Sequence, residues 1–202
     1  MDSANNKDSF VLSEIVHALR ENEPALSTIP ANTRRAGVAL ILKVHREELS
    51  VLLIQRSVRE DDPWSGHIAF PGGHHEESDV DLFDTVIRET QEEVGVTLSP
   101  ADYVSQLPFE KPYTSDQRAD LLVRPFVFVL RDMPELILNY EVSKVIWVPL
   151  ERLNSGELLA HETVHFNNNE YLLPGFRLND KQFVWGLTYR ILQRFFSTIA
   201  KS

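Results

Sequence analysis

A predicted helix with an acidic cluster on one face restricts the fold of this chain more than any other feature. Between residues 78 and 94 the apolar side chains recur at helical spacing: Phe83, Ile87 and Val94. On such a helix Glu89, Glu92 and Glu93 share one patch about 100° wide. Carboxylates at this spacing repel one another unless a cation lies between them. An acidic cluster alone is more often a solvated helix face, so its role depends on the neighbouring residues.

The ends of this helix and its one basic residue are also visible in the sequence. Ser78 followed by Asp81 resembles a capping box at the start, and Gly95 is a typical stop. Arg88 stands four residues before Glu92, where it can hold that carboxylate with a forked hydrogen bond. Oxygen ligands on one rigid element, without His or Cys among them, suit Mg²⁺ or Mn²⁺.

Composition excludes several other kinds of chemistry. The chain of 202 residues contains no cysteine, which excludes disulfides, thiolate zinc sites, iron–sulfur clusters and thiol nucleophiles. A hydrophobic fraction of 43% with 25% charged residues is typical of one globular core. The formal net charge of −10 argues against nucleic acid or an anionic membrane as a partner. Eight acidic residues against Arg88 alone lie within residues 76–93, so much of that charge belongs to one site.

The N-terminal residues give no sign of export. Residues 1–8 have neither the basic segment nor the apolar segment of a secretory signal. The most apolar runs of the chain are far shorter than the ~18–20 residues that span a bilayer. We therefore expect a soluble, cytoplasmic protein.

The sequence divides into an N-terminal extension, residues 1–34, and a main domain, residues 35–202. The extension contains a predicted amphipathic helix from Ser9 to Glu21, with Ser9 as its N-cap. This helix is expected either to pack on the main domain or to join two copies in a homodimer.

The pattern of the main domain predicts several strands and few helices. Predicted strands span about residues 36–44, 50–56, 120–130 and 144–149, and a further strand at 67–70 leads into a Pro-Gly-Gly turn. A hairpin is expected around residues 167–169. A final helix is expected over residues 180–200, with one apolar stripe: Phe183, Leu187, Ile191 and Phe195. This order indicates an α/β or α+β fold in which helices cover a mixed sheet.

The neighbours of the acidic helix give it a specific meaning. Phe70-Pro71-Gly72-Gly73 is followed by an acidic loop and then by Arg88-Glu89-Thr90-Gln91-Glu92-Glu93-Val94-Gly95. This combination resembles the signature of the Nudix hydrolases, whose fold is an α/β/α sandwich. Gly73 and Arg88 are 15 positions apart, where the commonest form of the signature has 14. Asp79 lies beside the loop position where the family usually has a glutamate.

An upstream block points to one branch of that family. Leu52-Leu53-Ile54-Gln55-Arg56-Ser57 and then Gly66-His67-Ile68-Ala69-Phe70 resemble the coenzyme A diphosphatases. The branch has an Arg and a His between these two segments, where this chain has Asp61-Asp62-Pro63-Trp64 and one residue more. Trp64 is either a stacking surface for a base or a plug that seals the loop against the core.

The resemblance implies roles for particular residues. The metal ligands, for Mg²⁺ or Mn²⁺, would be Gly72 through its backbone carbonyl, Glu89, Glu92 and Glu93. Arg88 would orient the glutamates, and either Glu89 or Glu141 would accept the proton of the attacking water. Arg56 and Phe70 would contact the substrate.

The implied activity is metal-dependent hydrolysis of a diphosphate linkage in a small nucleoside diphosphate derivative, with coenzyme A or acyl-CoA as the leading candidate. The alternative is a nucleotide-sugar, dinucleotide or nucleoside-triphosphate diphosphatase. A non-catalytic Nudix-like sensing domain usually lacks the glutamates that are present here. Residues 161–165 also fit the His-Glu-x-x-His pattern of zinc proteases, but that site needs a helix and this segment favours a strand.

Overall fold

A computed structural model describes residues 3–25, 29–30, 33–45, 48–58, 64–112, 120–166 and 169–201. The three residues Asp61-Asp62-Pro63, which depart from the coenzyme A branch, lie outside these ranges. No helix in the described ranges is both long and apolar enough to cross a lipid bilayer.

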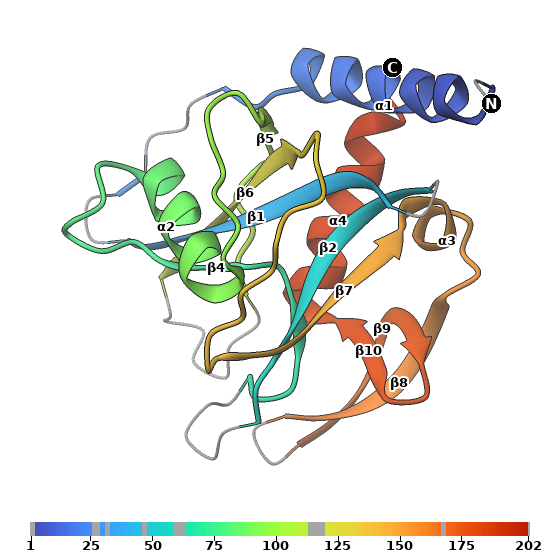
Figure 1. The fold of residues 1–202 in the computed structure, drawn as a ribbon. Coiled ribbons are helices and arrows are strands. Elements are labelled where there is room, and N and C mark those ends of the chain that lie inside the picture. Colours follow the sequence, from blue (N-terminus) through green and yellow to red (C-terminus); the bar gives the residue numbers. More distant parts are fainter. Residues whose placement is uncertain are drawn as a thin grey trace.

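The helices and strands follow one another along the chain as shown in Figure 1. The helices are α1 (Ser3–Glu21), α2 (Leu82–Val94), α3 (Leu150–Asn154) and α4 (Gly186–Ile199). The first strands are β1 (Arg34–His45), β2 (Glu48–Arg56), β3 (Ile68–Ala69), β4 (Gly72–His74) and β5 (Tyr103–Gln106). The later strands are β6 (Leu121–Val129), β7 (Val142–Pro149), β8 (Leu159–Phe166), β9 (Asn169–Asn179) and β10 (Gln182–Trp185).

The strands form two sheets. The larger sheet has the order β3-β2-β1-β6-β5, with β4 paired to β1 and β7 paired to β2. Its β1 and β6 run parallel and its other pairs antiparallel, which confirms the predicted mixed sheet. The smaller sheet, β10-β9-β8, is antiparallel. Its β8 and β9 form the predicted hairpin, whose turn residues 167 and 168 lie outside the described ranges.

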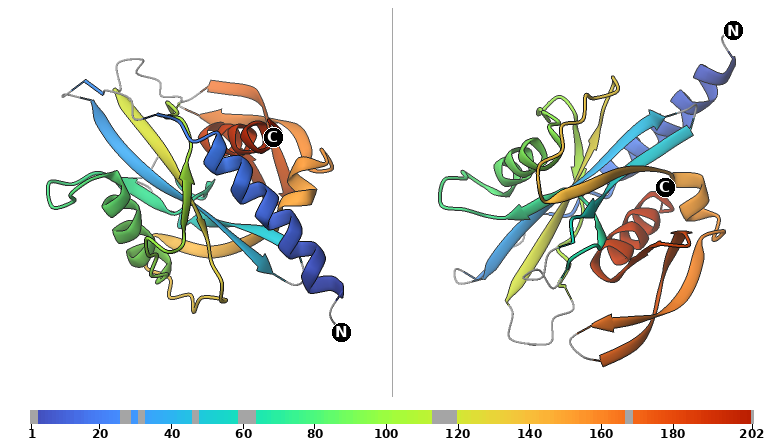
Figure 2. Two further views of the ribbon diagram at one scale, coloured as in Figure 1. Left: turned by 90° about the horizontal axis from the view of Figure 1, so that it is seen from above. Right: turned by 60° about the horizontal axis from the view of Figure 1, so that its bottom comes forward.

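Each face of the larger sheet has its own apolar cluster, because alternate residues of a strand point to opposite faces. The α2-side cluster includes Ala39, Ile41, Leu52, Ile54, Val86, Val94, Phe126 and Phe128. The α4-side cluster includes Leu40, Leu42, Leu53, Val127, Phe176, Ile191 and Phe195. The two helices therefore lie on opposite faces of the sheet, as the views of Figure 2 show. This is the predicted α/β/α sandwich.

The N-terminal helix packs on the same body. Leu19 of α1 is completely buried in the α4-side cluster, and the Ser105 hydroxyl of β5 donates to the Leu19 carbonyl at 3.0 Å. Just after the helix, the Glu23 carboxylate accepts hydrogen bonds from the Tyr103 hydroxyl and, at 3.3 Å, from the Gln106 N–H. The helix begins at Ser3, so the predicted N-cap at Ser9 is wrong. Residues 3–8 contain no proline or glycine, so this segment has no strong helix breaker that would make the helix start later in the chain.

Two other predicted boundaries need correction. Helix α2 begins at Leu82 and not near Ser78, and its N-cap is Asp81, which accepts from the Phe83 and Asp84 N–H groups. The predicted stop at Gly95 is confirmed, with φ at 75°. The final helix starts at Gly186, because residues 182–185 form strand β10.

Candidate active site

The glutamate that lies deepest in the site is Glu93. Only 3% of the surface of Glu93 is exposed, and the Gly72 N–H donates a hydrogen bond to the Glu93 Oε2 atom at 2.8 Å. Burial raises the pKa of Glu93 to about 8, with the nearby charges of Glu89 and Glu141 acting in the same direction. The Gly72 hydrogen bond and the positive charge of Arg56 act against that rise. Helix α2 thus places a carboxyl group with a strongly perturbed pKa against the Pro-Gly-Gly turn.

Glu89 lies over the next residue of that turn. A Cβ atom on Gly73 would come within 2.4 Å of the Glu89 Oε1 atom, so only glycine leaves room for this carboxylate. Burial raises the pKa of Glu89, the hydrogen bond from Arg88 lowers it, and the charges of Glu92 and Glu141 raise it. Gly73 therefore lets helix α2 place the Glu89 carboxylate directly against the backbone of the Pro-Gly-Gly segment.

Gly72 is required for a different reason. Its φ of 142° is a conformation that side chains disfavour, and an added Cβ atom would lie 2.2 Å from the Gly37 carbonyl oxygen. Gly72 pairs with Val38 in the β1–β4 ladder, and Gly73 pairs with Gly37. The Pro-Gly-Gly turn predicted from the sequence is therefore part of strand β4 from Gly72 onward, and the close approach of β4 to β1 sets its path.

Arg88 makes its fork with Asp79 and not with Glu92. Its Nε and Nη2 atoms donate to Oδ1 and Oδ2 of Asp79 at 2.9 and 3.0 Å. Its Nη1 atom donates to Glu89 Oε1 at 2.9 Å and lies 3.5 Å from Glu92 Oε2. Three carboxylates thus surround this guanidinium, and the predicted partner Glu92 is more distant from it than Asp79 and Glu89.

Asp79 is the residue that sequence reasoning missed as a member of the site. Its side chain is 4% exposed, and its Oδ2 atom also accepts from the Thr85 hydroxyl at 2.9 Å and the Glu76 N–H at 3.0 Å. The hydrogen bonds from Arg88 hold the pKa of Asp79 well below its usual range. The available signal was its place in the acidic loop beside the position of the family's usual glutamate.

The other predicted residues fall into two groups. Arg56, at the end of β2, and Glu141, just before β7, both act electrostatically on Glu93, and the Ser57 N–H donates to the Glu141 carbonyl at 2.7 Å. These two residues therefore belong to the glutamate cluster. Phe70 is 4% exposed and packs in the α4-side cluster, where it supports the fold beneath the turn.

The donor set of the cluster fits a hard divalent cation. Glu89, Glu92, Glu93 and Glu141 offer only oxygen atoms, and their charges act on one another. As they are placed, no three His, Asp or Glu side chains of the described ranges lie close enough together to surround a metal ion. Glu92, whose side chain is 56% exposed, lies 3.5 Å from Arg88. Cation binding therefore requires these side chains to rotate toward the ion.

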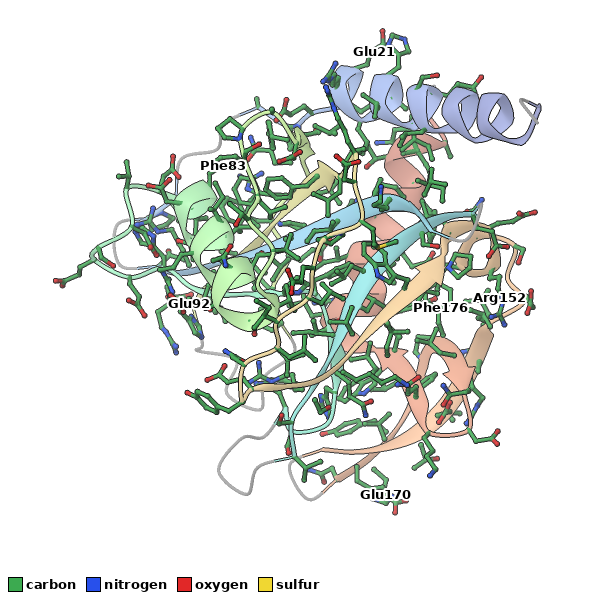
Figure 3. All side chains as sticks on the ribbon, in the orientation of Figure 1. Glu21, Phe83, Glu92, Arg152, Glu170 and Phe176 are labelled. Carbon is green, nitrogen blue, oxygen red and sulfur yellow. The ribbon has the colours of Figure 1, made fainter. Side chains whose placement is uncertain are left out.

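A cavity of about 490 Å³ lies away from this cluster, between the start of α2 and strands β5 and β6. Its walls include Phe83, Tyr103 and Arg124, and the Arg124 guanidinium lies 3.6 Å from the ring centre of Phe109. Figure 3 shows Phe83 and Glu92 at opposite ends of α2. The cavity is thus separate from the predicted site.

The His-Glu-x-x-His segment lies on strand β8, as predicted. Arg177 pairs with Glu162 at 2.6 Å, and His165 lies 3.5 Å from Glu170. A zinc protease needs the two histidines and the glutamate on a helix, so this segment is not such a site.

Comparisons with known proteins agree on one family. The NUDIX domain family matches residues 33–171, which is more than half of the chain. The uncharacterized Nudix hydrolase NudL of Yersinia enterocolitica is 31% identical over 189 residues, covering 91% of this chain and 90% of that protein.

Two relatives from Schizosaccharomyces pombe are longer than this chain. An uncharacterized protein is 46% identical over 51% of this chain, and a probable nudix hydrolase is 29% identical over 93%. The chain spans 32% of the first and 65% of the second.

Solved structures agree with this match. A MutT/nudix family protein from Enterococcus faecalis has a TM-score of 0.59 at 21% identity, covering 100% of this chain and 76% of that one, which confirms the fold. The NUDIX domain of Shewanella oneidensis NrtR, crystallised with ADP ribose, has a TM-score of 0.50 at 26% identity, covering 65% of this chain and 79% of that one. Together with the sequence match, these findings show that the chain belongs to the Nudix hydrolase family.

Proposed function

We propose that this protein hydrolyses a diphosphate linkage in a small nucleoside diphosphate derivative, with Mg²⁺ or Mn²⁺ as cofactor. The observation that carries this proposal is the set of carboxylates on α2 that meets the glycine turn, with Arg88 fixed beside them. The intact Arg88 and glutamates also argue against a sensing domain without catalysis.

The proposed metal ligands are the Gly72 backbone carbonyl, Glu89, Glu92 and Glu93. A bound divalent cation would neutralise the diphosphate and lower the pKa of a coordinated water. The chain supplies the remaining functions. Glu89, whose pKa is raised by burial, or Glu141 accepts the proton of the attacking water. Arg88 positions Glu89 through its 2.9 Å hydrogen bond, and Arg56 contacts a phosphate group.

Coenzyme A or an acyl-CoA is the proposed substrate. Its support is the resemblance of residues 52–57 and 66–70 to the coenzyme A diphosphatases. ADP-ribose is the second candidate, because the NUDIX domain of Shewanella oneidensis NrtR was crystallised with that ligand. Nucleotide sugars, dinucleotides and nucleoside triphosphates complete the range of substrates to be tested.

The test is a substrate panel with Mg²⁺ or Mn²⁺, in which the products are separated by chromatography. We expect coenzyme A to be cleaved to a nucleotide and a phosphopantetheine product, and Glu93→Gln to reduce turnover at least about tenfold. A glutamine oxygen can still accept from the Gly72 N–H, so this variant should fold. Glu151→Gln, an exposed change on α3, is the matched control. Unchanged turnover in folded Glu93→Gln would contradict the proposed metal site.

A further inference from the structure

Three aromatic side chains gather where the turn before β3 meets strand β10. The ring centre of His67 lies 5.7 Å from that of Trp64 and 4.9 Å from that of Trp185, with interplanar angles of 70° and 65°. Trp64 and His67 flank the turn before β3, and Trp185 is the last residue of β10. Each of the three residues keeps part of its surface exposed. We call these three residues the aromatic platform.

Backbone pairing places His67 of the aromatic platform opposite Arg56, a residue of the proposed active site. The Arg56 N–H donates to the His67 carbonyl at 3.0 Å, which continues the β2–β3 ladder, so these two residues lie opposite each other. Opposite residues of an antiparallel pair share one face of a sheet. Ile54 lies two residues before Arg56, Ala69 lies two residues after His67, and both pack in the α2-side cluster. Since residues two apart in a strand point to the same face, Arg56 and His67 also lie on the α2 side. Arg56, whose charge acts on Glu93, therefore links the platform to the glutamates.

Hydrogen bonds hold the elements of the aromatic platform in place. Gln182 of β10 donates from Nε2 to the Gln55 side-chain oxygen of β2 at 3.0 Å. Gln55 in turn donates from Nε2 to the Gly66 carbonyl at 3.5 Å, in the turn between Trp64 and His67. Strand β10 also contacts β3. The three rings thus come from two distant parts of the chain that are tied together through β2.

We propose that the aromatic platform binds the nucleobase of the substrate by stacking. This inference rests on the proposed function, because it places the base next to the residues assigned to the diphosphate. Every base has a flat π-face that stacks on aromatic side chains, and imidazole and indole are common partners in such contacts. An aromatic surface next to Arg56 matches a ligand with a ring at one end and a diphosphate at the other. The proposal assigns Trp64 a binding role and not that of a plug.

Tryptophan fluorescence tests the platform without any metal or phosphate. Adenosine is titrated into the protein, with ribose as the probe that lacks a base. We expect adenosine to quench the fluorescence saturably and ribose to leave it unchanged. Trp64→Ala and Trp185→Ala should each weaken adenosine binding about tenfold, the loss typical for one stacked base. Trp64→Phe, which keeps a ring, should bind more tightly than Trp64→Ala.

The third tryptophan provides the matched control. Trp147 packs against the α2-side cluster outside the platform, so Trp147→Phe should bind adenosine as the wild type does. Thermal unfolding of every variant identifies any loss of folding. Equal adenosine affinity in folded Trp64→Ala, Trp185→Ala and wild-type protein would overturn the proposal, and so would equal quenching by ribose.

Kinetics then separate this inference from the proposed function. With a cleaved nucleotide substrate, Trp64→Ala and Trp185→Ala should raise KM about tenfold with little change in kcat, because the platform does not touch the reacting atoms. Unchanged KM in both variants would overturn the platform while leaving hydrolysis established. Absence of hydrolysis throughout the panel, with adenosine binding weakened about tenfold in both variants, would overturn the proposed function and support the platform.

Discussion

At the scale of single residues, the site consists of one helix motif and several residues that come to it from elsewhere. The glutamates could be predicted because helical spacing alone puts them on one face. The fork between Arg88 and Asp79 could not, because it depends on how the loop before α2 folds back on the helix. The positions of Arg56 and Glu141 depend on the pairing of β2 with β7, which helical spacing does not reveal.

The two glycines of the turn should respond differently to the same substitution. In Gly73→Ala the new Cβ atom meets the end of the Glu89 side chain, which can rotate away, so the free energy of unfolding should change by less than about 1 kcal/mol. Turnover should still fall at least about tenfold, because Glu89 leaves its place.

In Gly72→Ala the new Cβ atom meets backbone atoms, and the residue keeps an unfavourable φ. The free energy of unfolding should therefore fall by about 1–3 kcal/mol or more. Urea unfolding and turnover of both variants measure this contrast. A fully active Gly73→Ala would contradict the role of Glu89.

The ion pair of Asp79 should make stability depend on pH. Arg88 lowers the pKa of Asp79 in the folded protein, so the stabilisation is complete above the unfolded pKa of about 3.9 and is lost as pH falls below it. Asp79→Asn should cost about 1.5–3 kcal/mol at neutral pH and should show a shallower decline in acid. Urea unfolding at several pH values gives both quantities. Asp132→Asn, an exposed change, is the control, and parallel pH profiles of Asp79→Asn and wild type would refute the argument.

At the scale of elements, periodicity found most of the sheet and both long helices of the main domain, but it misplaced their starts. Residues 183–185, Phe-Val-Trp, continue the apolar stripe of α4, yet their aromatic and β-branched side chains favour the strand that pairs with β9. The short elements α3 and β5 have too few residues to show a period. Long-range pairing decides such segments, and single-sequence patterns do not contain it.

The start of α2 offers a direct test at this scale. Asp81→Ala removes the side chain that caps Phe83 and Asp84, and should cost about 1 kcal/mol of unfolding free energy. Ser78→Ala, at the boundary that the sequence favoured, should change it by less than about 0.5 kcal/mol. Thermal or urea unfolding compares the two variants. A larger effect at Ser78 than at Asp81 would mean that the helix begins earlier in solution.

At the scale of the whole molecule, the N-terminal helix shares the core of the main domain. Leu19 is completely buried among residues of α4 and the larger sheet. Leu19→Ala should therefore lower the free energy of unfolding by about 2–5 kcal/mol. Leu172→Ala, at a residue that is 69% exposed, should change it by less than about 0.5 kcal/mol. Equal unfolding midpoints in urea for the two variants would show that α1 does not contribute to the common core.

The parallel pairing of β1 with β6 has a consequence for the order of folding. Residues 34–42 of β1 pair with residues 121–129, so this contact forms only after the whole segment that carries α2 has been synthesised. Contacts of such long sequence separation form slowly, because a large loop must close before they contribute. The β1–β2 hairpin can form early on the ribosome, whereas the sheet beneath the glutamates is completed late. We therefore expect the nascent chain to acquire the proposed cation site only in the last stages of folding.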